Sequence, residues 1–204
     1  TIKVTGPGVS TEDYQSNNGV DTLFWNFAQP FATDHSDDGE YVVTVKVEDK
    51  AANSTETEIT FIYDTEPPKV KTGSVLQVIP TPGAVINTAG LTSVSVTLED
   101  LSGIDLDKST IELKGPRGVI AGKKTDNGVD NLIFEFAPLK RDGSDDGKYT
   151  ITVKPADKVG NVAFPLEFTF IYDTSPPIIR ALVPTAGSTV FSPLYLVSAT
   201  LDDG

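Results

Sequence analysis

Side-chain oxygens of aspartate and asparagine recur at fixed places in this chain, and they are the groups most able to do chemistry. Oxygens of this kind can coordinate a divalent cation such as calcium, which takes about six to eight of them. They are far apart in sequence, so no EF-hand loop is present. Aspartate and asparagine also form turns by bonding their own backbone, which is the alternative. The candidate ligands are Asp64 and Asp173 before two prolines; Asp49, Asn53, Asp157 and Asn161 in one kind of turn; and Asp100, Asp105, Asp202 and Asp203 in another.

Other reactive residues do not form a recognisable catalytic set, and we predict no catalytic residue and no enzyme. The single histidine, His35, lies beside Ser36 and Asp37, but an equivalent segment further along the chain has Gly143 in its place. Adjacent loop residues seldom supply a nucleophile, a base and an oxyanion pocket together. Two SDDG segments are predicted to be tight turns, with cation binding as the alternative: Ser36–Gly39 and Ser144–Gly147.

The chain contains an internal repeat. Residues 110–177 repeat residues 1–68 at an offset of 109, from TIELKGP against TIKVTGP to YDTSPP against YDTEPP. The segment that starts at Pro184 similarly matches the segment that starts at Pro80. A fixed period indicates an array of similar modules. We predict three units: an incomplete domain with strands three to seven (residues 1–65), a complete domain (residues 66–174), and the first two strands of a further domain (residues 175–204).

Apolar residues alternate with polar ones in the segments that carry most of the valine, isoleucine and threonine. Tyr41–Asp49, Thr92–Asp100 and Tyr149–Asp157 all have a period of about two, which predicts half-buried strands. Tyr41 and Tyr149 occupy the place where sandwiches often have a tyrosine that bonds back to the backbone. The predicted fold class is all-β, with tandem immunoglobulin-like antiparallel β-sandwiches. For the complete unit the predicted strands are 69–79, 91–99, 110–115, 118–123, 131–137, 149–155 and 163–172.

The charge balance excludes several classes of partner. Acidic residues outnumber basic ones 29 to 16, the formal net charge is −13, and there is no lysine or arginine cluster. Nucleic acid and anionic membrane surfaces are therefore poor partners. No apolar run approaches the ~18 to 20 residues of a membrane helix, so we expect no membrane insertion. Without cysteine the chain has no disulfides.

Several motifs resemble a known family. YDTEPP (Tyr63–Pro68), YDTSPP (Tyr172–Pro177), DLSGID (Asp100–Asp105) and DKVGN (Asp157–Asn161) are similar to the bacterial Ig-like tandem repeats of large secreted and surface proteins, including biofilm-associated adhesins. The resemblance covers nearly the whole chain. It implies an extracellular or cell-surface location, with calcium held at domain junctions by the acidic residues named above. Such modules serve as stalks, binders and enzyme accessories alike.

The two linkers and the two incomplete units predict how the chain is used. Paired prolines make Asp64–Pro68 and Asp173–Pro177 short, stiff joints, so the units should line up as a rod. The strands that the first unit lacks are those that the last unit has. Exposed sheet edges and apolar faces favour strand addition. We therefore predict a structural subunit of an extracellular filament or surface fibre, assembled from copies of itself, head to tail, by strand complementation of the split Ig-like domain.

Four alternatives to this filament remain. The last unit could fold back on the first, which the stiff linkers and the intervening domain oppose. The ends could be cuts through a longer tandem array, and a chain that opens at Thr1 in mid-repeat is expected to be a piece of a longer product. The chain could also be the stalk segment of a surface adhesin, with ligand or carbohydrate binding elsewhere, or an accessory module of a secreted enzyme. In those cases a surface glycan or the cell envelope is the expected contact.

Overall fold

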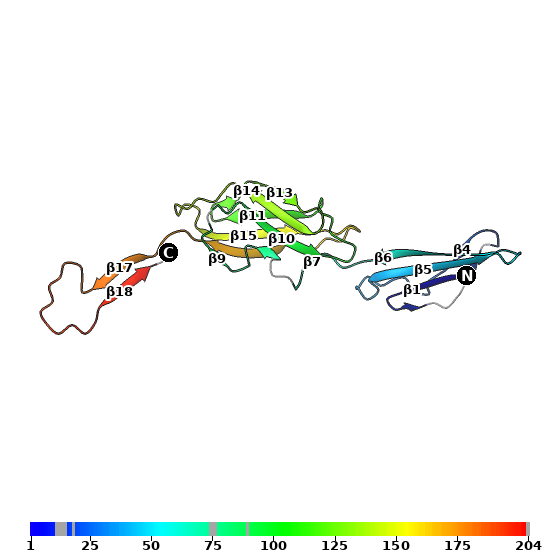
Figure 1. The fold of residues 1–204 in the computed structure, drawn as a ribbon, viewed down its shortest axis with the longest axis horizontal. Coiled ribbons are helices and arrows are strands. Elements are labelled where there is room, and N and C mark those ends of the chain that lie inside the picture. Colours follow the sequence, from blue (N-terminus) through cyan, green and yellow to red (C-terminus); the bar gives the residue numbers. More distant parts are fainter. Residues whose placement is uncertain (11–15, 18, 74–76, 89, 203–204) are drawn as a thin grey trace.

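The computed structural model describes all residues except 11–15, 18, 74–76, 89 and 203–204. Strands are the only regular secondary structure among the described residues, and turns and loops connect them. Three groups of strands follow one another along the long axis (Figure 1). Among the described residues there is no helix that could cross a membrane. The N-terminal unit has β1 (Ile2–Gly6), β2 (Val9–Ser10), β3 (Ser16–Asn17), β4 (Leu23–Phe24), β5 (Gly39–Glu48) and β6 (Ser54–Tyr63).

The central unit contains two complete sheets. One has the order β13-β14-β10-β7, with β8 also on β10, and the other has the order β12-β11-β15-β16-β9. All pairs are antiparallel except β9 with β16. This is the ABED and CFG arrangement of immunoglobulin domains, so the fold is Ig-like. The strands are β7 (Lys69–Val70), β8 (Val78–Ile79), β9 (Val85–Ile86), β10 (Ser93–Glu99), β11 (Thr110–Gly115), β12 (Gly118–Val119), β13 (Gly122–Asp126), β14 (Asn131–Phe136), β15 (Gly147–Lys154) and β16 (Leu166–Tyr172).

Alternate residues of the central strands meet between these two sheets. In β10 every second residue is buried and the others are half-buried, as the period of two predicts. The inner residues of both sheets form one apolar core, so each sheet covers the other. Its fully buried members include Val94, Val96, Leu98, Leu113, Leu132, Ile151, Val153 and Phe170.

Most predicted strands are confirmed. The single strand predicted over 69–79 is wrong, since among its described residues only the two ends form strands, β7 and β8. The other differences have local causes. Strand β11 has the predicted bounds, but the single strand predicted over 118–123 is wrong. The chain instead crosses between sheets there, since β12 pairs with β11 and β13 pairs with β14. Strand β9 was not predicted, because its two-residue parallel contact with β16 leaves no periodic pattern.

The predicted tyrosine contacts are confirmed in both repeats. The Tyr149 hydroxyl donates to the main-chain carbonyl of Asp145 at 2.7 Å, and Tyr41 donates to that of Asp37 at the same distance. Both rings are buried. Each ring lies against a glycine of the KGP or TGP motif, and a Cβ on Gly115 would come within 2.7 Å of the Tyr149 ring. The glycine is therefore required by the tyrosine.

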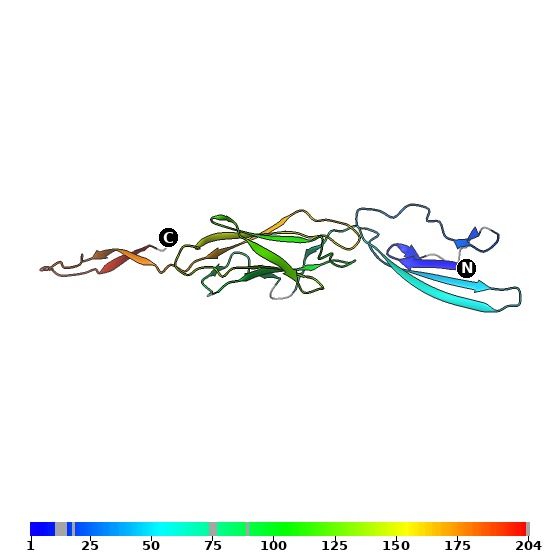
Figure 2. The same cartoon turned by 90° about the horizontal axis from the view of Figure 1, so that it is seen from above.

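The N-terminal unit has one four-stranded sheet, and the described residues leave much of its inner face uncovered. Its order β2-β1-β5-β6 corresponds to β12-β11-β15-β16, while β3 and β4 form only a short ladder above it (Figure 2). Ile151 and Val153 are fully buried, but their counterparts Val43 and Val45 are half-buried, and Ile59 is 59% exposed. An open cavity of about 700 Å³ lies at the end away from the linker. Within the described part of this unit, no strand corresponds to β7, β8, β9 or β10.

An aromatic cluster fills the linker end of the same unit. The Phe31 ring stacks on Tyr41 at 4.7 Å between ring centroids and contacts Tyr63 edge-on at 4.9 Å. Phe61 and Phe27 complete this cluster. Such ring pairs stabilise a core beyond the area that they bury. These ring contacts stabilise the linker end of the unit without help from strands equivalent to β7–β10.

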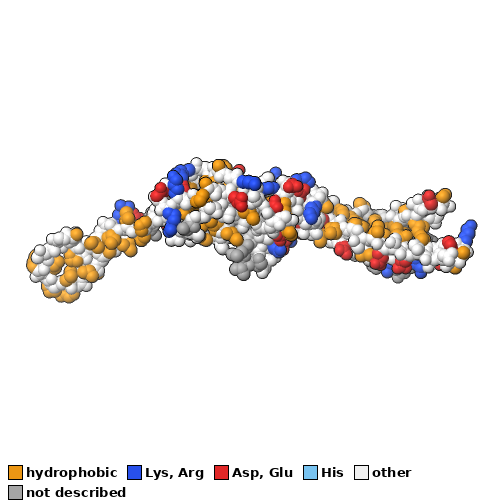
Figure 3. All heavy atoms as spheres, turned by 45° about the horizontal axis from the view of Figure 1, so that its top comes forward, with side chains coloured by type: hydrophobic (Ala, Val, Ile, Leu, Met, Phe, Trp, Pro, Cys, Tyr) orange, Lys and Arg blue, Asp and Glu red, His pale blue; other side chains and the backbone are white. Residues whose placement is uncertain are grey.

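The C-terminal unit is a hairpin of β17 (Ile178–Val183) and β18 (Ser198–Asp202). Its pairing repeats that of the central unit. Val183 pairs with Ser198 as Ile79 pairs with Ser95, and Ile179 pairs with Leu201 as Val70 pairs with Leu98. Large apolar side chains of this unit are open to solvent (Figure 3), among them Val190, Phe191, Leu194, Tyr195, Leu196, Val197 and Leu201. The division into folding units at residues 65 and 174 stays a prediction.

Matched valine-to-alanine changes should show which inner face is covered. Val153→Ala should lower the free energy of unfolding by about 1 to 3 kcal/mol, because it leaves a cavity in a closed core. Val45→Ala should cost less than about 1 kcal/mol, because water already reaches this site. Denaturant unfolding measures both, with fluorescence of the single Trp25 reporting on the N-terminal unit. Equal losses at the two sites would contradict the uncovered face.

Candidate inter-unit joint and cation site

Both Asp-Thr-x-Pro-Pro linkers are held by the second aspartate of an SDDG segment. Asp38 accepts hydrogen bonds from the Thr65 amide at 3.0 Å, the Thr65 hydroxyl at 2.9 Å and the Glu66 amide at 3.1 Å. In the next repeat, Asp146 accepts from the amides and hydroxyls of the corresponding threonine and serine, at 2.7 to 3.0 Å. Each linker is therefore fixed to the unit that precedes it.

Sequence reasoning predicted turns at the SDDG segments and missed this role. The first aspartate does support the local loop, since Asp145 accepts from the Lys140 amide at 2.7 Å. His35 also contacts the first linker, with its Nδ1 at 2.9 Å from the Thr65 hydroxyl oxygen. The one signal that could have revealed the linker contact is that SDDG and DTxPP occur together in both repeats.

Three predicted cation ligands meet where the first linker enters the central unit. One carboxylate oxygen each of Asp64, Asp100 and Asp157 lies within 4.8 Å of the others. Asp64 follows β6, Asp100 follows β10, and Asp157 lies in the loop after β15. Asp157 is fully buried and Asp64 is 9% exposed. The fold thus gathers three acidic groups from distant parts of the chain.

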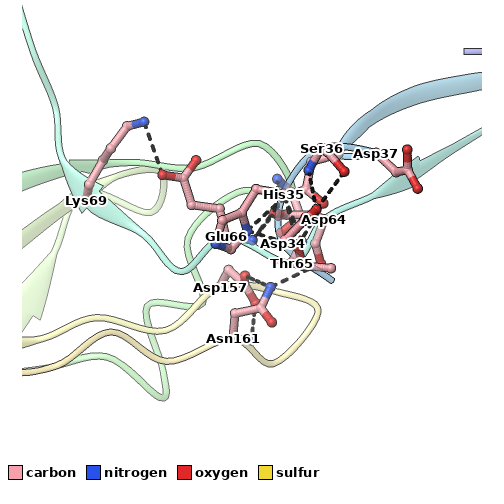
Figure 4. Close-up of polar contacts among 12 residues, drawn as sticks. Asp34, His35, Ser36, Asp37, Asp64, Thr65, Glu66, Lys69, Asp157 and Asn161 are labelled. Atoms are coloured by element: carbon pink, nitrogen blue, oxygen red, sulfur yellow. Dashed lines mark hydrogen bonds and ion pairs between the residues drawn. The ribbon is translucent and has the colours of Figure 1, made fainter. Parts of the chain in front are cut away.

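Hydrogen bonds hold this cluster in place. The Asp157 Oδ1 atom accepts from the amides of Val159, Gly160 and Asn161, which fixes the loop. The Asn161 side-chain nitrogen donates to Asp157 at 2.7 Å and to the main-chain carbonyl of Asp64 at 3.1 Å (Figure 4). Asn161 therefore ties the loop of the central unit directly to the linker.

The cluster attracts one nearby cation without forming an ion pair with it: the pKa of Lys108 is raised first by its hydrogen bond to Asp105 and also by the charge of Asp157. Burial is the main cause that raises the pKa of Asp100, and repulsion from Asp64 and Asp157 raises it further. No ion pair recorded in the described part of the chain reaches these three carboxylates. Carboxylate oxygens and a nearby main-chain carbonyl are ligands that calcium prefers, so this donor set fits the ion.

The other predicted ligands lie elsewhere. Asp105 forms an ion pair with Lys108 at 2.9 Å, and that hydrogen bond lowers the pKa of Asp105. Asp173 is in the second linker, and Asp202 lies in β18, where it forms an ion pair with Arg180 of β17. Asp203 lies outside the described residues. Asp49 and Asn53 form the loop after β5, at the opposite end of the N-terminal unit from the first linker (Figure 1).

Comparison with known proteins finds similar solved structures but no family. No protein-family model matches the chain, and no curated protein matches it. Similar solved structures include a titin fragment (12% identity, 86% of this chain and 84% of that chain, TM-score 0.39) and a variant of the SrpA adhesin of Streptococcus sanguinis (16%, 54% and 59%, TM-score 0.35). Extracellular cadherin domains 3–6 of protocadherin gamma B2 also match (14%, 79% and 39%, TM-score 0.32). At these values the Ig-like class rests on the strand order itself.

Acid should release the second linker from Asp146. Hydrogen bonds, above all from the Ser175 hydroxyl, lower the pKa of Asp146 below its ordinary 3.8. The stability that these hydrogen bonds contribute is then present above pH 3.8. It is lost as the pH falls through the lowered pKa that Asp146 has in the folded state. Protection of the Thr174 and Ser175 amides in hydrogen exchange should disappear in that range. Asp146→Ala should remove this protection at every pH.

Asp142→Ala is the matched control. The carboxylate of Asp142 accepts from Ser144 in its own turn and not from the linker. This variant should leave the exchange of Thr174 and Ser175 unchanged. Full protection of these amides in Asp146→Ala would show that the carboxylate does not hold the linker.

Proposed function

We propose that this chain is a structural subunit of an extracellular filament or surface fibre, in which the C-terminal hairpin of one copy completes the N-terminal unit of the next. The observation that carries the proposal is the match between the two ends. The β17–β18 hairpin has the pairing of the strands that the N-terminal unit lacks. The inner face of that unit is partly open where these strands would lie.

The central unit supplies the register of the proposed contact. There, β10 pairs with β14, with Val94 opposite Phe134 and Ser95 opposite Ile133. Mapping these pairs through the repeat places Val197 of one copy opposite Trp25 of another, and Ser198 opposite Phe24. The parallel contact of β9 with β16 similarly places Thr189 and Val190 beside the end of β6. The composite domain would then have the complete Ig-like strand order.

Burial and charge both favour this contact. The apolar side chains of the hairpin are exposed here, with Val197 69% and Leu201 64% exposed. Burying each such side chain contributes on the order of 1.5 to 3 kcal/mol before ordering costs. In the central unit Lys71 forms an ion pair with Asp130 at 2.9 Å, and their counterparts are Arg180 and Asp21. The same pair of charges would therefore face one another between copies.

Folding back within one chain is opposed by geometry. The central unit lies between the open face and the hairpin along the long axis (Figure 1). A head-to-tail contact that does not close propagates as a filament. The tandem Ig-like fold and the fixed linkers support a surface setting of the biofilm-associated adhesin type as part of this proposal.

Two introduced cysteines should link copies in the proposed register. Phe24→Cys with Ser198→Cys places thiols at directly opposed strand positions, about 4.5 to 5.5 Å apart between Cα atoms, within disulfide reach. The native chain has no cysteine to compete. Oxidation should give a ladder of covalent oligomers in denaturing gels run without reductant.

Phe24→Cys with Ala199→Cys is the control, because neighbouring strand residues face opposite sides of a sheet. This pair should give far less covalent product. Equal products from the two pairs, or a cross-linked monomer, would contradict complementation between copies. Absence of oligomers from the first pair would favour the alternative in which a preceding repeat of the same polypeptide supplies the strands.

Calcium at the first linker is a further part of the proposal. The ion would be held by Asp64, Asp100 and Asp157, the three carboxylates that lie together. Titration calorimetry should detect binding, and calcium should raise the unfolding temperature because it binds the folded state. Asp64→Asn combined with Asp100→Asn should abolish both effects.

Asp105→Asn is the matched control for that experiment. Asp105 was also predicted to be a ligand, but it is paired with Lys108 outside the cluster. Calcium binding and the temperature shift should persist in this variant. Loss of binding in Asp105→Asn, or its retention in the double variant, would rule out the proposed ligand set.

A further inference from the structure

The first linker shows how a linker meets the unit that follows it. The loop Asp157–Asn161 lies against the linker, and Asn161 donates its side-chain N–H to the carbonyl of Asp64 at 3.1 Å. This contact covers the linker, since Asp64 and Pro68 are both buried. It also covers the loop, since Asp157 is fully buried. The contact joins one unit to the next.

The N-terminal unit carries the same loop in an exposed position. Asp49 Oδ1 accepts from the amides of Ala51 and Asn53 at 2.8 and 2.9 Å, as Asp157 does in its own loop. The Asn53 side chain donates to Asp49 at 2.9 Å. Ala52 adopts a φ of 65°, a conformation that glycine takes more readily, where the other loop has Gly160. The loop thus keeps its shape despite an unfavourable backbone conformation at Ala52, although its residues are exposed.

The second linker likewise keeps the shape of the first. The Ser175 amide donates to Asp173 at 3.1 Å, as the Glu66 amide donates to Asp64 at 3.1 Å. Yet Asp173 is only half-buried and Pro177 is exposed. No donor to the main-chain carbonyl of Asp173 is recorded among the described residues. The surface that a following unit covers at the first linker is open at the second.

We infer that the Asp49–Asn53 loop is a docking loop for the Asp173–Pro177 linker of another copy. Asn53 donates its side-chain N–H to the carbonyl of Asp173, as Asn161 does to Asp64 within one chain. The inference rests on the proposed complementation, which brings this loop and this linker to the same junction. The partner is therefore a second copy of the chain. The junction between copies then has the same contacts as the junction within a copy, so one kind of joint repeats along the fibre.

Hydrogen exchange on disulfide-linked oligomers tests this contact. The full chain carrying Phe24→Cys and Ser198→Cys is compared in its oxidised, linked form and in its reduced form, diluted until it is monomeric. Linking should slow exchange of the amides of Ala51, Asn53, Thr174 and Ser175. Adding Asn53→Ala should speed exchange at Thr174 and Ser175 in the linked form by about 2- to 10-fold, the factor for one net hydrogen bond.

The reduced form separates a docking role from a role in the loop alone. In reduced protein, Asn53→Ala should leave Thr174 and Ser175 unchanged. Asn161→Ala, the matched variant at the first linker, should speed exchange at Thr65 and Glu66 in both forms.

The two hypotheses fail in different ways. If linked oligomers form but Asn53→Ala leaves the second linker unaffected, the docking loop is wrong and complementation stands. If no linked oligomer forms, complementation between copies is wrong, and the docking loop between copies falls with it.

Discussion

The structure depends on one requirement, that the inner face of each Ig-like sheet be covered by a second sheet. In the central unit β10 meets this requirement, and the residues opposite it, such as Ile151 and Val153, are fully buried. In the N-terminal unit the same positions are half-buried, because none of the strands described there is equivalent to β10. An aromatic cluster around Phe31 fills only one end. The apolar face and the C-terminal hairpin are therefore both left exposed, and this exposure is the basis of the proposed contact between copies.

The linkers set the direction in which successive units follow one another. Each is fixed to the preceding unit by an aspartate, Asp38 or Asp146, that accepts several hydrogen bonds. The first is also fixed to the following unit through Asn161. A joint held on both sides restricts rotation between units in addition to the stiffness of its prolines. The acidic cluster at this joint adds charge that a cation would neutralise.

Much of the central fold could be predicted from alternation of apolar residues, but sheet membership could not. The pattern identified β10, β11, β14, β15 and β16, whose inner residues are all packed against the opposite sheet. It failed at 118–123, because alternation does not reveal that a chain leaves one sheet for another after two residues. The residues of the candidate cation site could likewise be predicted only in part. Asp100 and Asp105 lie in the same turn, and only packing separates Asp100, beside the linker, from Asp105, which pairs with Lys108.

The sequence by itself determined the repeat, the strand class and the complementary character of the two ends, because these follow from residue types at regular spacing. It also determined which oxygens were available for a cation. Only the tertiary structure decided which of them meet, and it showed that the SDDG aspartates hold the linkers. Those contacts join residues about 30 to 100 positions apart. Their geometry depends on how whole sheets pack, which no local pattern encodes.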